Sequence, residues 1–220
     1  MKHLLVVCIL LTTFISCKKN TLTLSCSKEI NDWANSVIAY YELAPREQII
    51  QLPISRQRAI FRGLSSKRKV SLWNDKLSLI LYDETYTEEQ CADFSVLIKQ
   101  LDATVFDDEV CQKAFNEYAE LWETSMKDKY GWDENVLFML AYTWMTEEEF
   151  IQSVLAESNL IVKGSGSGEI DIDDENDCNC RTDIYCKGLR YIECDKENNP
   201  CNITSGCGIL GTSNCIGKCK

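Results

Sequence analysis

Apolar side chains recur at steps of three and four residues over most of positions 27–160. This spacing places them on one face of a helix, because an α-helix turns once every ~3.6 residues. The first such set is Ile30, Trp33, Val37, Tyr40 and Tyr41, and later sets are Val70, Trp73, Leu77 and Leu81, then Phe94, Leu97, Ile98 and Leu101. The pattern predicts an all-α bundle of about six or seven helices with a large aromatic core.

Residues with strong positional preferences mark where these helices begin and end. Pro53 opens a segment that Gly63 closes, and Gly131 is expected to stop a long helix that begins near Asp107 and Asp108. Thr87–Gln90 and Thr146–Glu149 both match a capping box, in which a threonine and a Gln or Glu three residues later satisfy the first backbone N–H groups. Positions 136–144 are apolar almost all round, which predicts either a central helix or a poorly amphipathic one.

The first sixteen residues have the pattern of a bacterial lipoprotein signal peptide. A basic start precedes a mostly apolar run at positions 4–15, which is shorter than the ~20 residues that span a bilayer. Ser16 and Cys17 complete a sequence that resembles a lipobox, in which the cysteine is lipidated and becomes the mature N-terminus. We therefore expect removal of residues 1–16 and anchoring in a membrane through Cys17. A plainly secreted protein and an uncleaved anchor are the alternatives.

Composition divides the rest of the chain into four parts. We expect residues 17–26 to form a polar tether, 27–160 a helical domain, 161–177 a Gly/Ser and acidic linker, and 178–220 a small cysteine-rich module. The linker begins with alternating glycine and serine, which makes a flexible chain, and continues with an acidic run. That run weakly matches a calcium loop but lacks its glycine and final glutamate, so we interpret it as a solvated linker.

The C-terminal segment, residues 178–220, holds eight of the thirteen cysteines. They are Cys178, Cys180, Cys186, Cys194, Cys201, Cys207, Cys215 and Cys219. A segment this short cannot bury enough apolar surface to fold unaided, so it needs disulfides or metal ions. Disulfides are favoured, because the chain is expected to be exported and the paired Cys-x-x-Cys motifs of zinc sites are missing. The glycine-rich spacing predicts a loop-rich or β-hairpin knot, and the pairing of the cysteines stays open.

Three more cysteines, Cys26, Cys91 and Cys111, lie outside that segment in the mature chain. A bridge between Cys91 and Cys111 and a pair of buried free thiols are both compatible with the sequence.

The composition argues against an enzyme. Loss of the signal peptide also removes His3, the only histidine, and so excludes a Ser-His or Cys-His catalytic pair and histidine-containing zinc sites. The acidic clusters at 107–109 and 147–149 lie at expected helix starts, where carboxylates complement the helix dipole. The tryptophans are expected to pack in the core. We therefore predict no catalytic residue, no metal and no cofactor.

The net charge of −11 also disfavours nucleic-acid partners, which require a basic surface.

Two sets of motifs resemble known bacterial proteins. The C-terminal segment resembles fulvocin C, a small disulfide-rich bacteriocin, in Cys178-Asn-Cys180, Tyr185-Cys186, Gly206-Cys207-Gly208, Cys215 and Cys219. The middle of the chain is similar to exported Bacteroidetes proteins of the bacteriocin fulvocin C-related family, in Arg58-Ala59-Ile60-Phe61, Leu72-Trp73 and Thr87–Gln90.

This resemblance implies a lipid-anchored protein of the bacterial cell envelope that carries an antibacterial module, released or presented against an envelope component of other bacteria. The alternative is a non-toxic envelope lipoprotein whose cysteine-rich head binds a protein or a glycan. Both hypotheses place the chain outside the cytoplasm, on the periplasmic face or the cell surface, and name the membrane as a partner through Cys17.

Overall fold

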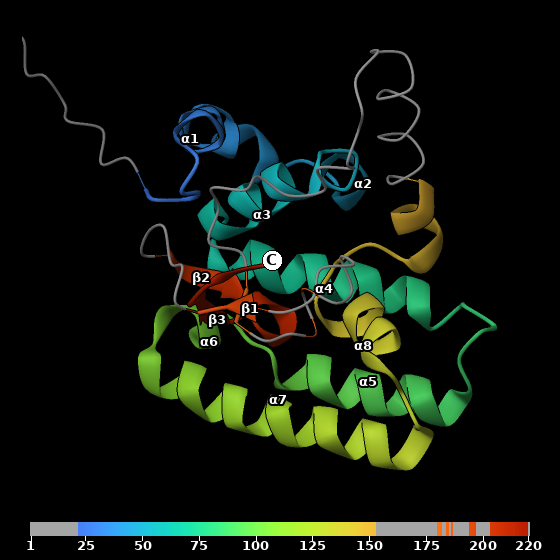
Figure 1. Cartoon of the computed structure of the whole chain (residues 1–220). Coiled ribbons are helices and arrows are strands. Elements are labelled where there is room, and N and C mark those ends of the chain that lie inside the picture. The colour runs from blue at the N-terminus through green and yellow to red at the C-terminus, as the bar shows by residue number, and fades with distance from the viewer. Residues whose placement is uncertain are drawn as a thin grey trace, which may run out of the picture.

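The computed structural model describes residues 22–152, 180–181, 184, 186, 194–196 and 203–219. These residues are mostly helical, as the hydrophobic pattern predicts (Figure 1). The helices are α1 (Lys28–Tyr41), α2 (Arg46–Ile49), α3 (Ile54–Gly63), α4 (Ser66–Ile80), α5 (Glu88–Gln100), α6 (Thr104–Asp107), α7 (Glu109–Tyr130) and α8 (Glu134–Ala141). A further helix begins at Glu147. The C-terminal segment contributes β1 (Cys194–Asp195), β2 (Ile203–Cys207), the 3-10 turn η1 (Ile209–Gly211), β3 (Ser213–Cys215) and β4 (Lys218–Cys219).

Helix boundaries coincide with the capping residues in the sequence. Thr87 and Gln90 form the expected capping box at the start of α5. Thr146 and Glu149 form a second one, in which the Thr146 N–H donates to Glu149 Oε2 over 2.7 Å. Gly131 ends α7 in the left-handed region, with φ of 65°, which a residue with a Cβ adopts at a cost. The positions at which these helices begin and end were therefore predictable.

The buried face of α4 differs from the expected one. Its buried residues are Lys69, Leu72, Trp73, Lys76 and Ile80, whereas Leu81 is 51% exposed. The observed buried face is therefore rotated by about one residue around the helix from the expected stripe of Val70, Trp73, Leu77 and Leu81. A count of apolar positions could not find this face, because two of its members are lysines whose aliphatic stems pack inside the protein.

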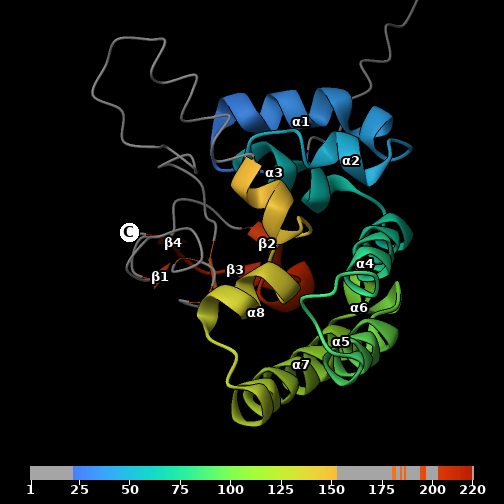
Figure 2. The same cartoon turned by 90° about the vertical axis from the view of Figure 1, so that its right-hand side faces the viewer.

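The helices enclose part of the C-terminal segment. Figure 1 shows α1 to α3 above and α5 and α7 below, with β2 and β3 between these two groups. The side view places α8 near the centre, next to the hairpin (Figure 2). α3 packs against β2, and α7 packs against η1. The long-range contacts therefore connect the two ends of the chain.

The strands form two small antiparallel pairs. β2 pairs with β3, with Ile203 opposite Cys215 and an irregularity before Cys207. β1 pairs with β4, and a single bridge joins Cys180 to Gly217. This small strand content agrees with the hairpin interpretation of the sequence.

β2, η1 and β3 of the expected cysteine-rich module pack directly on the helices of the expected helical domain. Ile209 and Leu210 belong to the same buried cluster as α3, α4 and α8. The expected linker, residues 161–177, lies outside the described residues. The sequence suggested a separate module because its glycines and cysteines differ in composition from the helices, but composition does not show where a segment packs.

Candidate functional site

The described cysteines of the C-terminal segment are all joined in pairs. The disulfides are Cys180–Cys194, Cys186–Cys219 and Cys207–Cys215, with Cα atoms 5.8, 5.2 and 5.1 Å apart. Cys178 and Cys201 lie outside the described residues, as does the expected lipidation site Cys17. Disulfide bonds are thus present in the segment where the sequence analysis expected them.

The three cysteines outside the C-terminal segment differ in their bonding state. Cys26 is disulfide-bonded, with a partner outside the described residues, and it packs against Ile203 and the Cys207–Cys215 disulfide. Cys91 and Cys111 are free thiols, so the bridge considered between them does not form. Burial raises the pKa of the Cys91 thiol, and the negative charge of Asp83 adds to this effect. Cys91 is therefore a protonated, unreactive thiol at neutral pH.

Two of the disulfides lie next to each other. The sulfur atoms of Cys180, Cys186 and Cys219 are all within 4.8 Å of one another, a spacing that would also suit thiolate ligands of one metal ion. In this oxidised chain each of these sulfurs is bonded to another sulfur. None of the three is a thiolate, so the cluster binds no metal in this form.

The 3-10 turn η1 is the part of the C-terminal segment that enters the helical core. Leu210 is fully buried, and its carbonyl oxygen accepts a hydrogen bond of 2.9 Å from the indole N–H of Trp73 on α4. Gly211 lies so close to Phe61 of α3 that an added Cβ would be 2.6 Å from its ring. Trp144 packs on the same ring, with centroids 4.7 Å apart. η1 thus fills a space lined by aromatic side chains.

A second contact joins the same turn to α7. The side-chain amide of Gln112 donates to the carbonyl oxygen of Thr212 over 2.6 Å, and the Thr212 hydroxyl donates to Asn116 Oδ1 over 2.7 Å. Thr212 is itself fully buried. The hairpin is therefore held from both sides, by α3 and α4 on one and by α7 on the other.

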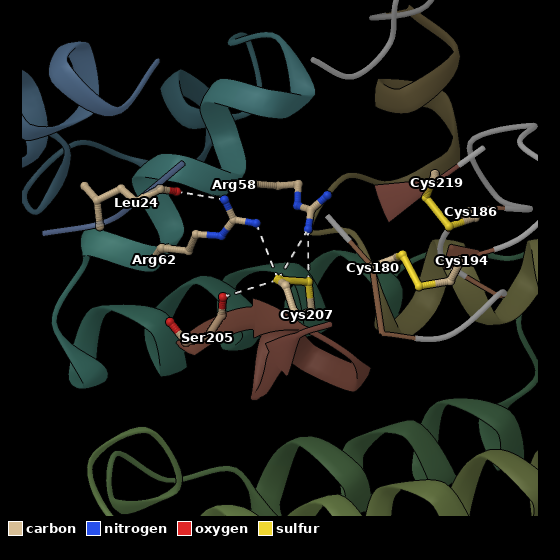
Figure 3. Close-up of a disulfide and its surroundings, with 10 residues drawn as sticks. Leu24, Arg58, Arg62, Cys180, Cys186, Cys194, Ser205, Cys207 and Cys219 are labelled. Carbon is tan, nitrogen blue, oxygen red and sulfur yellow. Dashed lines mark hydrogen bonds between the residues drawn. A yellow bond between two sulfur atoms is a disulfide. The ribbon is translucent and has the colours of Figure 1, made fainter. Parts of the chain in front are cut away.

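Two arginines of α3 lie one helical turn apart and point at the Cys207–Cys215 disulfide (Figure 3). Arg58 Nη2 is 3.1 Å from Cys207 Sγ, and Arg62 Nη2 is 3.5 Å from Cys215 Sγ. Arg62 also donates to the carbonyl oxygen of Leu24 over 2.7 Å. Arg58 and Arg62 are 3% and 6% exposed, so the guanidinium groups are buried with the sulfur atoms.

This arrangement has a definite chemical consequence. Positive charge beside a disulfide stabilises the thiolate that leaves when another thiolate attacks one of its sulfur atoms. However, Cys207 and Cys215 are only 4% and 2% exposed, and thiol–disulfide exchange requires access to a sulfur atom. In the folded chain this disulfide therefore connects the two strands and does not take part in exchange.

The other buried cations are also bonded within the helical region. The Lys76 ammonium donates to the carbonyl oxygens of Met139, Leu140 and Thr143, at and beyond the end of α8. Arg46 forms a salt bridge of 2.6 Å with Glu149. Burial lowers the pKa of Lys76 well below its ordinary value, and the charge of Arg46 adds to that effect.

The predicted acidic clusters have mainly structural partners. Asp108 caps α7 by accepting from the N–H groups of Val110 and Cys111. Hydrogen bonds from Arg46 and Thr146 overcome the opposing effect of burial and lower the pKa of Glu149. Sequence reasoning missed Arg58, Arg62, Lys69 and Lys76 as members of the interior. The only signal for Arg58, Lys69 and Lys76 is that each lies three or four residues from a large apolar residue on the same helix, and Arg62 lacks even this signal.

Comparison with protein families, with curated proteins and with solved structures gives no match to this chain. The resemblance to the bacteriocin fulvocin C-related family therefore stays a prediction.

Proposed function

We propose that the chain is an exported, lipid-anchored protein of the bacterial cell envelope that binds a partner while its C-terminal segment stays attached to its helical domain. In this proposal residues 27–160 form a helical bundle, Cys17 carries the lipid, and the chain has no catalytic activity. The disulfides support an exported protein, because they persist in oxidising compartments. Among the described ranges, no helix is both long and apolar enough to cross a membrane.

The burial of Leu210 is the observation that favours an attached C-terminal segment over one that is released as an intact module. Removal of η1 from the core would leave the Trp73 N–H without its acceptor and would expose the aromatic side chains around Phe61. An unpaired buried N–H costs about 1–3 kcal/mol, and each large apolar side chain contributes a similar amount. These contacts favour a C-terminal segment that binds its partner while it stays packed on the helices.

The second candidate is a bacteriocin-like protein whose C-terminal segment is cleaved off and acts on other bacteria. One observation favours it. The disulfides Cys180–Cys194, Cys186–Cys219 and Cys207–Cys215 all close within the C-terminal segment, so a fragment cut before Cys180 would keep these three crosslinks.

Mass spectrometry of cells and culture medium separates the two candidates. The binding role predicts an intact chain in the membrane fraction at all growth stages and no fragment near residues 169–220 in the medium. Appearance of that fragment, together with killing of other bacteria by the purified oxidised fragment, would replace the binding role with the bacteriocin role.

The lipid anchor has its own test. Replacement Cys17→Ala should move the protein from the membrane fraction to the soluble periplasmic fraction and remove the lipid mass from its N-terminus. Replacement Cys111→Ala is the matched control, because it removes an exposed free thiol and should leave the fractionation unchanged. An unaltered membrane fraction for the Cys17 variant would exclude lipid anchoring at this residue.

A further inference from the structure

Three parts of the helical region line an open groove. These parts lie on the right-hand side of Figure 1. They are the turn between α2 and α3, the C-terminal end of α4 with the residues that follow it, and the helix that begins at Glu147. The groove has a volume of about 1260 Å³, enough for several side chains of a bound molecule. The described residues that line it all come from the helical region.

Large apolar side chains lie in this groove without full cover. Leu79 is 41% exposed and Ile151 is 47% exposed, and they line the groove with Leu52 and Pro53. A cluster of exposed apolar side chains of this kind is typical of a binding surface.

The rim of the groove is acidic. Asp83, Glu147 and Glu148 line it and are exposed, and no lysine or arginine is among the described residues that line it. Glu149 also lines the groove, but it is paired with Arg46 in a salt bridge. The three rim carboxylates have no such cation within the described part of the chain.

The negative charge of these carboxylates affects the pKa of the neighbouring Tyr86. Burial, together with the charges of Asp83 and Glu147, raises the pKa of Tyr86 to about 12. Burial is the larger cause of this shift, and the two carboxylates add to it. A cationic ligand would therefore be attracted to this rim, and an anionic one would be repelled.

We propose that the groove binds a cationic, amphipathic peptide segment. Such a segment places an apolar side chain against Leu79 and Ile151 and a lysine or arginine beside Glu147 and Glu148. Apolar contact supplies affinity, and complementary charge supplies orientation and selection against acidic segments. This interaction goes beyond the proposed role of the C-terminal segment and does not depend on it.

The test uses the oxidised mature chain and a fluorescently labelled synthetic helix in which leucine lines one face and lysine the other. Binding is followed by fluorescence anisotropy at low and high salt. The double variant Glu147→Gln/Glu148→Gln should weaken binding roughly two- to thirtyfold, because each of the two exposed ion pairs contributes about 0.2–1 kcal/mol. Leu79→Ser and Ile151→Ser should each weaken it as well, with little change in the salt dependence.

The matched control is Glu29→Gln/Glu120→Gln, which removes two exposed carboxylates on α1 and α7 and leaves the groove intact. Its affinity for the peptide should equal that of the parent chain. Equal weakening in the control would show that the peptide responds only to the overall charge of −11 and would overturn the proposal. No binding at low salt, or equal binding of a peptide with glutamate in place of lysine, would also overturn it.

Discussion

Two lysines of α4 lie in the interior, and their ammonium groups are stabilised in different ways. Lys76 is 1% exposed and donates to three backbone carbonyls, so its charge is paired with the dipoles at the end of α8. Lys69 is 6% exposed and lies over the rings of Phe61 and Phe106, 5.6 and 5.2 Å from their centres. Aromatic faces attract a cation less strongly than carbonyl groups bond it.

Replacement Lys76→Met should destabilise the protein by about 2–4 kcal/mol, because three carbonyl oxygens near the end of α8 lose their donor. The methionine fills the same volume, so loss of packing adds little. Urea unfolding at pH 7 measures the change, and Lys113→Met on the exposed surface of α7 is the control. A variant as stable as the parent would show that solvent satisfies these carbonyls.

Lys69 predicts a pH dependence of stability. Burial lowers the pKa of Lys69 to about 8 in the folded chain, from an ordinary value of 10.5. Between these values the unfolded chain binds more protons than the folded one, so this lysine makes stability rise with pH. The difference in unfolding free energy between the parent chain and Lys69→Met should therefore shift in favour of the parent from pH 8 to pH 10.5, by on the order of 2–3 kcal/mol.

Urea unfolding at pH 7, 8, 9 and 10 tests this expectation, with Lys113→Met as an exposed control whose difference from the parent should be flat. A flat difference for Lys69→Met as well would mean that its ammonium group is fully solvated in the folded chain.

The sequence could indicate which residues cap helices but not which cations are buried. Thr87 and Gly131 act through local backbone geometry, which a short stretch of sequence specifies. Lys76, Arg58 and Arg62 depend on acceptors 38 to 157 positions away in the chain. A pattern along one helix carries no information about such distant partners.

At the level of elements, η1 is the feature that joins the C-terminal segment to the helices. It needs two residues in the left-handed region, Leu210 with φ of 53° and Gly211 with φ of 69°. The glycine-rich pattern of the segment predicted turns, and this one is where it was expected. The pattern could not show that the turn packs beneath α3, because that depends on the shape of the cavity left by the helices.

Replacement Gly211→Ala should therefore be strongly destabilising. The new Cβ would meet the Phe61 ring at 2.6 Å, and the backbone would keep a strained positive φ. We expect a loss of about 2–4 kcal/mol, from strain plus overpacking. Gly131→Ala is the matched control, because it has a similar φ of 65° but open space around the Cβ, and should cost only about 1 kcal/mol. Equal losses in thermal unfolding would show that the contact with Phe61 relaxes freely.

At the level of the whole molecule, the two ends of the chain depend on each other. The N-terminal stretch is held by Arg62 at Leu24, and the disulfide-bonded Cys26 packs against the hairpin of the C-terminal segment. The sequence suggested the opposite, a helical domain and a tail that could part. Cysteine count and composition were enough to predict the disulfide-bonded character of the segment, but its attachment depends on Arg58, Arg62 and Trp73, which carry no such signal.

A chain that ends at residue 177 should consequently lose much of its stability. It lacks Ile209 and Leu210, each worth about 1.5–3 kcal/mol when buried, and it leaves the Trp73 N–H unpaired for a further ~1–3 kcal/mol. Their sum, roughly 4–9 kcal/mol, is comparable with the ~5–15 kcal/mol that stabilises an ordinary domain. The truncated chain should unfold at a much lower temperature and without a sharp transition in circular dichroism, whereas the full chain should show a single sharp transition.

Addition of the oxidised 178–220 segment should restore part of the transition. A truncated chain that unfolds at the temperature of the parent would mean that the helical domain is stable without the hairpin, which is the behaviour required for a released C-terminal fragment.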